Sequence, residues 1–402
     1  VVHDSSERKE HMIVYLVVLR IWIAYGLSIT TRPTLSESLA RKGITISPKV
    51  QILALEGRGL GLVAKEAIAK GEIIIQIPLK KCIVASPLEK SQTGEHLAQK
   101  LVAAWLKDKE DIGDKVLPKL ERVHGLPVHW IDCDIPFPLK ERVKTRRTRR
   151  ATLMSELSDD DAILLSNALD TVSTRSFRLG ATRSRTALLL AILLVSIAAT
   201  NSVPFFYVPI FSLLLFLPRY FIGTDAVILA GADFMNHKAN AKTRIVYNAL
   251  FDAIQVRAES QIAGEEIALN YGEKSNDDFL LDWGFVLKDN VHDTVSINLK
   301  EHGVCRIGRF AQLTWLDQNL LPQSPHRKVD DRIYSLLQTA AISARDRFRE
   351  EMKPTPSSLS KNQDNATSLT HSQRSQRNLG MQWRQGKVTL LDEFLAASPT
   401  SF

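Results

Sequence analysis

The chain has 402 residues, 45% of them hydrophobic and 24% charged, with a formal net charge of +8. This is ordinary globular composition with enough length for two or three domains. Its three cysteines, Cys82, Cys133 and Cys305, are odd in number and far apart. They exclude a disulfide framework and a zinc cluster, and they favour a reducing, intracellular compartment.

The N-terminal third begins with an apolar stretch and continues with short strands. Residues 12–30 are apolar but contain Arg20, so a signal sequence, a poor membrane span and a buried helix all remain open. We treat residues 1–34 as an N-terminal extension. Ser36–Gly43 is predicted to be a helix closed by its glycine. Val50–Val84 is predicted to form short strands separated by glycine-rich turns.

Two helical segments are predicted next, at Glu95–Leu120 and Asp159–Val172. Between them lies "KERVKTRRTRR", Lys140–Arg150, which carries much of the positive charge. We interpret this run as a solvated helix face or loop, with a site for an acidic partner or a nucleic-acid patch as alternatives. Nucleic-acid binding is the weakest of these, because the run has no interleaved aromatic residues.

A second strand-rich region follows. Thr224–His237 reads as a strand that leads into a polar turn, and glycine and polar residues separate the later apolar runs. Three further short strands are predicted at 243–248, 253–258 and 266–272.

The remainder is predicted to be mainly helical. Residues 277–286 begin as a helix that Asn276 or Asp277 could cap. After Asn290 the chain is expected to be helical again, with an amphipathic helix at Asp330–Met352. Lys353–Arg377 is polar and serine-rich, which indicates a flexible linker. A short helix is expected at 390–397.

Four motifs occur in a fixed order, and each is weak alone: "GRGLGLVA" at 57–64, "STRSF" at 173–177, "ADFMNH" at 232–237 and "GEEIALNYGEKSN" at 264–276. Together they resemble the SET-domain protein methyltransferases, and most closely the branch that includes the Rubisco large-subunit lysine methyltransferase. The resemblance covers residues 35–178 and 223–290. A weaker similarity at 381–397 is to the last helix of that branch's C-terminal substrate-binding domain.

The resemblance implies an α+β fold. A β-rich SET domain with a threaded, knot-like core would span 35–290, with a helical insertion at about 95–172. A shortened α-helical C-terminal substrate-binding domain would span 291–402, with the flexible linker at 353–377.

The chain departs from this family between the second and third motifs, where the connection is usually short. Thr186–Pro218 contains no charged residue. This run is long for one membrane helix, which takes about 20 residues, and short for two such helices joined by a turn. A single crossing would put Arg175 and Asn236 on opposite sides of a membrane, although the resemblance implies that both belong to one pocket. We therefore interpret residues 181–222 as a non-native insertion, such as translated intron sequence, or as a long variable loop. Membrane association is expected only if this segment is native.

The resemblance assigns the cofactor site. Backbone groups of Arg58, Gly59, Leu60 and Gly61 would contact S-adenosylmethionine. Arg175 would pair with the carboxylate of the cofactor, a geometry that suits a guanidinium.

The last two motifs complete the site. Asn236 and His237 would hold the amino-acid and adenosine portions of the cofactor, in a segment that starts at Asp233. Tyr271 would sit at the methyl-transfer channel, where this segment and the tyrosine meet in the core. Asp233 and Tyr271 thus belong to the predicted cofactor-binding set, and Tyr271 is the predicted catalytic residue.

Methyl transfer to lysine requires a neutral amine. The ordinary lysine pKa of about 10.4 means that deprotonation at pH 7 costs roughly 4–5 kcal/mol, and a dry channel beside a sulfonium lowers that pKa. Alignment then matters more than a strong base. Tyr271, with an ordinary phenol pKa near 10, is expected to stay protonated and to orient the acceptor.

The predicted function is S-adenosylmethionine-dependent methylation of a lysine in a non-histone protein. A histidine acceptor, a catalytically inactive SET-like binding module and a membrane-associated protein are the alternatives. A monomer without zinc is expected, in an intracellular compartment that the residues leave open between cytoplasm, nucleus and plastid.

Overall fold

The computed structural model describes residues 35–56, 59–85, 93–110, 117–118, 120–180, 224–248, 250–299, 302–316, 331–353 and 370–397. The predictions made for the N-terminal extension, for Arg58 and for the apolar insertion at 181–222 fall outside these ranges.

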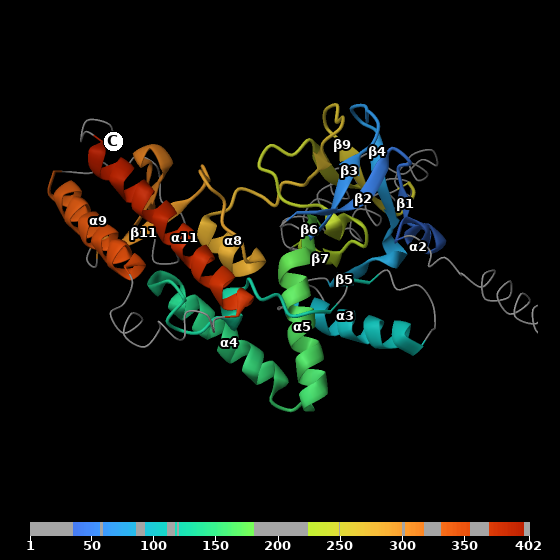
Figure 1. Cartoon of the computed structure of the whole chain (residues 1–402), viewed down its shortest axis with the longest axis horizontal. Coiled ribbons are helices and arrows are strands. Elements are labelled where there is room, and N and C mark those ends of the chain that lie inside the picture. Colours follow the sequence, from blue (N-terminus) through green and yellow to red (C-terminus); the bar gives the residue numbers. More distant parts are fainter. Residues whose placement is uncertain are drawn as a thin grey trace, which may run out of the picture.

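Three small antiparallel sheets build one lobe, on the right of Figure 1. Their strand orders are β1-β4-β9-β8, β10-β3-β2 and β5-β7-β6. The strands predicted within 50–84, at the start of 224–237, at 243–248 and at 253–258 are confirmed, whereas the strand predicted at 266–272 has only two residues and the strand at 176–180 was not predicted. The bounds are β1 (Thr45–Ile46), β2 (Val50–Leu55), β3 (Gly59–Ala64), β4 (Ile73–Pro78), β5 (Ile83–Ala85), β6 (Ser176–Gly180), β7 (Thr224–Ile228), β8 (Thr243–Asn248), β9 (Ala253–Ala258) and β10 (Glu266–Ile267).

Strands that are far apart in the sequence pair in this lobe. β4 lies beside β9, with Ile77 opposite Ile254, and both side chains are fully buried. Burial of such β-branched side chains on a pleated surface is what favours the extended conformation here. The early and late segments of the chain therefore share one hydrophobic core.

Helices cover the lobe and extend from it. α2 (Leu35–Arg41) ends just before Gly43, whose φ is +78°, as predicted. α3 (Thr93–Glu110) packs against α5 (Asp159–Arg175). Ser158 caps α5 by accepting from the Asp161 N–H, which satisfies a free donor at the helix start.

The basic run forms α4 (Lys140–Met154), and its arginines are bound within the chain. Arg142 pairs with Asp278 at 2.8 Å and Arg146 with Asp282 at 2.6 Å. The interpretation of this run as a simply solvated face is therefore incomplete. The arginines attach α4 to the segment that follows the tyrosine motif.

The C-terminal lobe, on the left of Figure 1, is a three-stranded antiparallel sheet with two long helices. Its elements are β11 (Thr294–Asn298), β12 (Val304–Gly308), β13 (Leu313–Leu316), α9 (Asp331–Met352) and α11 (His371–Ala396). The expectation of helix directly after Asn290 is wrong, because alternate residues of β11 are buried and pair along β12. That period of two belongs to a strand.

Three further details of the helices differ from the sequence predictions. The flexible linker does not reach residue 377, because Thr370 and Gln373 form a capping box at the start of α11. The predicted short helix at 390–397 is the end of this 26-residue helix. α8 (Asn276–Trp283) is capped by Ser275, not by Asn276 or Asp277.

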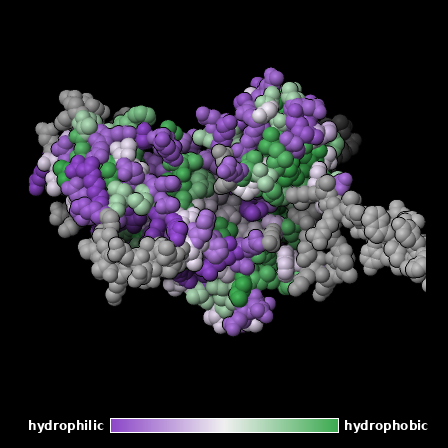
Figure 2. Space-filling view, in the orientation of Figure 1, coloured by the Kyte–Doolittle hydropathy of each residue, from purple (hydrophilic) through white to green (hydrophobic). Residues whose placement is uncertain are grey.

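Hydrophilic residues cover most of the outer surface of both lobes on the face that Figure 2 shows. Among the described helices, none is both long enough and apolar enough to span a bilayer.

Candidate active site

Two short segments lie side by side in the strand-rich lobe, residues 233–238 after β7 and residues 266–271 around β10. The Leu269 N–H donates to the Asn236 carbonyl at 2.9 Å, and the Lys238 N–H donates to the Leu269 carbonyl at 3.0 Å. These backbone bonds bring the third and fourth sequence motifs into contact.

Tyr271 is fixed at both its backbone and its ring. Its hydroxyl donates to the Met235 carbonyl at 2.7 Å, and its N–H donates to His237 Nδ1 at 3.2 Å. Burial is the main reason that the pKa of Tyr271 rises to about 12, with Asp233 adding to the rise and Arg175 opposing it. The hydroxyl is therefore protonated at neutral pH.

His237 is a neutral member of an aromatic cluster. Its ring centre lies 5.2 Å from that of Tyr271 and 4.8 Å from that of Phe279. Burial lowers its pKa, and a hydrogen bond with the Leu269 backbone opposes this only in part. An uncharged ring can accept the Tyr271 N–H, so the histidine supports the backbone beside the tyrosine.

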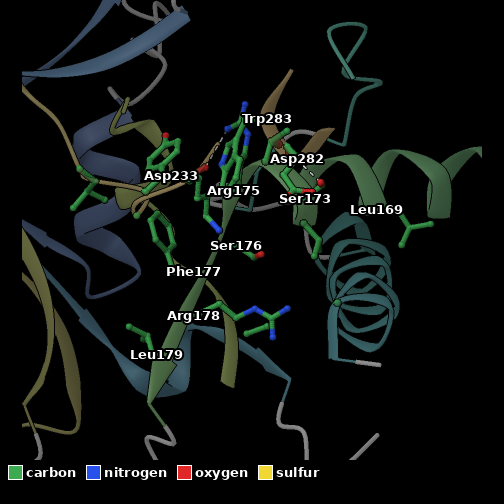
Figure 3. Close-up of a pocket in the computed structure, with 18 of the residues that line it drawn as sticks. Leu169, Ser173, Arg175, Ser176, Phe177, Arg178, Leu179, Asp233, Asp282 and Trp283 are labelled. Atoms are coloured by element: carbon green, nitrogen blue, oxygen red, sulfur yellow. Dashed lines mark hydrogen bonds and ion pairs between the residues drawn. The ribbon is translucent and has the colours of Figure 1, made fainter. Parts of the chain in front are cut away.

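Arg175 is the last residue of α5 and reaches the turn after β7. Its guanidinium lies 3.2 Å from the carboxylate of Asp233 (Figure 3). The Asp233 side chain is 2% exposed, whereas the Arg175 side chain is 38% exposed. Burial raises the pKa of Asp233, against the Arg175 charge and the Gly231 N–H, which donates to it at 2.8 Å. One side of the guanidinium is thus held while the rest stays accessible.

Residues 59–61 of the glycine-rich motif lie in strand β3, on another side of the 233–238 segment. A Cβ at Gly61 would come within 2.3 Å of the Leu55 side chain and 3.4 Å of Asn236 Nδ2, so glycine allows this close approach. Asn236 Nδ2 also donates to Glu266 Oε1 at 2.7 Å. Gly59 has a φ of +77°.

A cavity of about 1010 Å³ opens beside these residues (Figure 3). Arg175, Asp233 and Tyr271 line it. Of the other predicted site residues that the structure describes, Gly59–Gly61, Asn236 and His237 are not part of its wall. The structure therefore groups the arginine, the aspartate and the tyrosine around one space, and it joins the remaining predicted residues to them through the 233–238 segment.

Sequence reasoning missed Trp283, which lies in the wall of this cavity. Its ring is stacked on that of Tyr271, with centres 5.4 Å apart and an angle of 27°. Lys274 Nζ lies 5.4 Å from the centre of the same indole. A signal was available, because the tryptophan ends the helix that directly follows the tyrosine motif.

The structure also shows what holds α8 against the site. The Ser173 hydroxyl donates to the Asp282 carbonyl at 3.0 Å (Figure 3), and Arg146 donates to the Leu281 carbonyl at 2.7 Å. The C-terminal end of α8 is thereby fixed to α5 and α4. Within the described ranges, no group of three or more His, Cys, Asp or Glu side chains is placed to hold a metal ion.

Comparison with known proteins gives the class. The SET domain family model matches residues 59–272, which is more than half of the chain, and the chain belongs to this family. Its fold is similar to that of the solved Rubisco LSMT bound to AdoMet, with a TM-score of 0.53, 13% identity and 90% of each chain covered. The SET domain of LSMT bound to MeLysine and AdoHcy matches with a TM-score of 0.51, at the same identity and coverage.

Two curated relatives are similar over shorter stretches. Ribosomal lysine N-methyltransferase set10 of Schizosaccharomyces pombe is 34% identical over 80 residues, which is 19% of this chain and 14% of the relative. Ribosomal lysine N-methyltransferase 1 of Saccharomyces cerevisiae is 32% identical over 89 residues, 21% of this chain and 15% of the relative. The matched stretches thus cover about one seventh of each relative.

Proposed function

We propose that this protein is an S-adenosylmethionine-dependent protein-lysine N-methyltransferase that acts on a non-histone protein. The observation that carries the proposal is the geometry around Tyr271 in a SET-domain chain. Its protonated hydroxyl is bound to the Met235 carbonyl. Tyr271 and the partly exposed Arg175 guanidinium line the same cavity.

The residues of the site fit the cofactor. Arg175 offers an accessible guanidinium, pre-oriented by Asp233, for the cofactor's carboxylate. Asn236 and His237 follow on the same segment and would hold the rest of the molecule. When bound, S-adenosylmethionine supplies a methyl group on a positively charged sulfur.

The glycine-rich strand would contribute backbone groups. β10 pairs with β3 only at Leu62 and Val63, so among the described strands Gly59, Leu60 and Gly61 are paired on the β2 side alone. Their other edge can face a ligand. The corresponding role of Arg58 stays a prediction from the sequence.

Tyr271 would orient the acceptor amine. Because its proton is used by the Met235 carbonyl, the lone pairs of its oxygen are available to accept a hydrogen bond from a neutral lysine. A phenol with a pKa of about 12 is not ionised at neutral pH and removes no proton from the ammonium. The acceptor must lose that proton before the reaction, at a cost of roughly 4–5 kcal/mol at pH 7, and burial in the cavity beside the positively charged sulfur of the cofactor would favour the neutral form.

The names of the relatives indicate which acceptor proteins to test first. The curated relatives are named as ribosomal lysine methyltransferases, which makes purified ribosomal proteins the first acceptors to test.

The experiment is transfer of labelled methyl groups from S-adenosylmethionine to ribosomal proteins and to a cell extract. The wild-type chain is run beside Tyr271→Phe, which keeps the ring and removes the hydroxyl. We expect label in a discrete protein, strongly reduced with the variant, and methyl-lysine after acid hydrolysis. Methyl-histidine would assign the other acceptor. No label with folded wild-type protein that binds the cofactor would contradict the proposed activity and leave a non-catalytic SET-like module.

A further inference from the structure

A lysine of α11 is buried against α8 and the start of β11. Lys387 of α11 is 1% exposed, and its ammonium lies 2.7 Å from a carboxylate oxygen of Asp277, of Asp293 and from the Thr294 carbonyl. The three N–H donors of the ammonium therefore have three acceptors. Burial lowers the pKa of Lys387, but the two carboxylates outweigh it and the pKa is raised, so the group is charged.

These contacts fix the N-terminal end of α8. Asp277 lies in the first turn of α8 and also accepts from Trp383 Nε1 of α11 at 3.0 Å. Asp293 accepts from the Asn276 N–H at 2.8 Å. Asp277 is thus bound directly to α11, and Asn276 is linked to the same helix through Asp293, which pairs with Lys387.

The same short helix carries the rings that pack on the site. Phe279 contacts His237, and Trp283, about one turn further along α8, is stacked on Tyr271. A helix of eight residues moves as a rigid unit, because its hydrogen bonds fix the rise of each residue. A change at Asp277 is therefore transmitted to Phe279 and Trp283.

We propose that Lys387 is a positioning residue for methyl transfer: it holds α8, and through α8 it places the rings beside His237 and Tyr271. The inference rests on the proposed methyltransferase function. It gives the C-terminal lobe a part in positioning the rings beside the predicted catalytic tyrosine.

The test uses the full chain with two variants. Lys387→Met keeps most of the side-chain volume and removes the ammonium, which leaves Asp277 and Asp293 together without a cation. Asp277→Asn is milder, because the amide oxygen can still accept from Trp383. Arg349→Ala is the matched control, since it removes an exposed ion pair of Arg349 with Asp392 between α9 and α11 and touches nothing on α8.

Three readouts are compared at a temperature where the variants are folded by circular dichroism. They are the S-adenosylmethionine Kd by calorimetry, kcat for labelled methyl transfer, and the ¹⁹F resonance of Trp283 in protein made with 5-fluorotryptophan. We expect both variants to shift that resonance and to lower kcat, Lys387→Met by at least about tenfold, since small misplacements of an aligned site are costly. Arg349→Ala should change neither.

The outcomes separate this inference from the proposed function. If Lys387→Met does not fold, Asp277→Asn decides. Folded variants that melt earlier but keep the wild-type kcat, Kd and Trp283 resonance would overturn the positioning role and leave a purely structural one. A wild-type chain that binds no S-adenosylmethionine would instead contradict the proposed function.

Discussion

The guanidinium of Arg175 and the carboxylate of Asp233 lie 3.2 Å apart, at the end of α5 and in the turn after β7. One partner is buried and the other is partly open to the cavity. The buried carboxylate therefore orients the arginine without using all of its donors, and the remaining donors can bind an anionic group.

Replacing Arg175 with alanine should weaken cofactor binding by at least about tenfold, because a charge-assisted hydrogen bond of about 1.5–3 kcal/mol is lost. Arg175→Lys should lose less, since it keeps the charge but not the planar fork. Titration calorimetry with S-adenosylmethionine measures both. Equal affinity in the wild type and Arg175→Ala would contradict the role of this residue.

The pKa of Tyr271, about 12, gives a pH prediction. Methyl transfer should keep increasing from pH 7 to about pH 10, as the acceptor lysine loses its proton, with no step from Tyr271. The folded-state value lies above the ordinary value of 10, so this group's contribution to stability is complete below pH 10 and is lost as the pH rises through about 12. Ultraviolet difference titration of the wild type against Tyr271→Phe detects the ionisation. A tyrosine that ionises near pH 8 would contradict this account.

Asp170 should be essential for the stability of α5. It is fully buried and binds Arg150 at 2.7 Å, His129 at 2.6 Å and the Val123 N–H at 2.9 Å. Burial acts to raise its pKa, but the His129 hydrogen bond and the Arg150 charge outweigh it, and the pKa is lowered. Asp170→Asn should lower the free energy of unfolding by about 3 kcal/mol at pH 7.

The pH dependence of that effect has a defined sign. A lowered folded-state pKa stabilises the protein above the ordinary value of 3.8, and this contribution is lost as the pH falls through the folded-state value. The difference between the wild type and Asp170→Asn in urea unfolding should therefore shrink below pH 3.8. Asp346→Asn, in an exposed pair with Arg345, serves as the control and should change stability by less than about 1 kcal/mol.

A side chain at position 284, where the chain has Gly284, should destabilise the fold. Gly284 ends α8 with a φ of +74°, and a Cβ there would lie 2.7 Å from the Gly125 backbone. Gly284→Ala should cost about 2 kcal/mol or more, from the left-handed conformation and the backbone contact together. Gly43→Ala is the matched control, because its φ is +78° and nothing lies within 4 Å, so only about 1 kcal/mol is expected. Thermal unfolding of the two variants should differ clearly, and equal melting temperatures would show that the Gly125 contact is not limiting.

The strand-rich lobe was predictable from the sequence because local patterns decide it. Short apolar runs interrupted by turn residues predict the strands around Ile77 and Ile254, and the order of the motifs indicates the family. The capping residue of α8 was missed by one position, because Ser275 and Asn276 are both good caps and only the backbone shows which one accepts.

The C-terminal lobe was less predictable, because partners far away in the sequence decide it. Lys387 lies among polar residues in the sequence, which predicts an exposed side chain. In the structure its ammonium is buried and paired with Asp277 and Asp293. The position of Trp283 after the tyrosine motif places it near the site, but only the structure shows its ring stacked on that of Tyr271. Buried polar networks and ring stacking depend on distant contacts and leave no local periodicity.

The β6–β7 pairing has a consequence for the length of the segment that joins the two strands. Gly180 lies opposite Thr224, and the ladder continues to Ser176 opposite Ile228. The backbone therefore leaves and re-enters the domain at neighbouring points, with Arg175 just outside the ladder. Lengthening a connection between fixed ends costs only about 0.6 kcal/mol per doubling. A segment of different length can therefore be inserted between β6 and β7 at a small entropic cost, while the two strands stay paired.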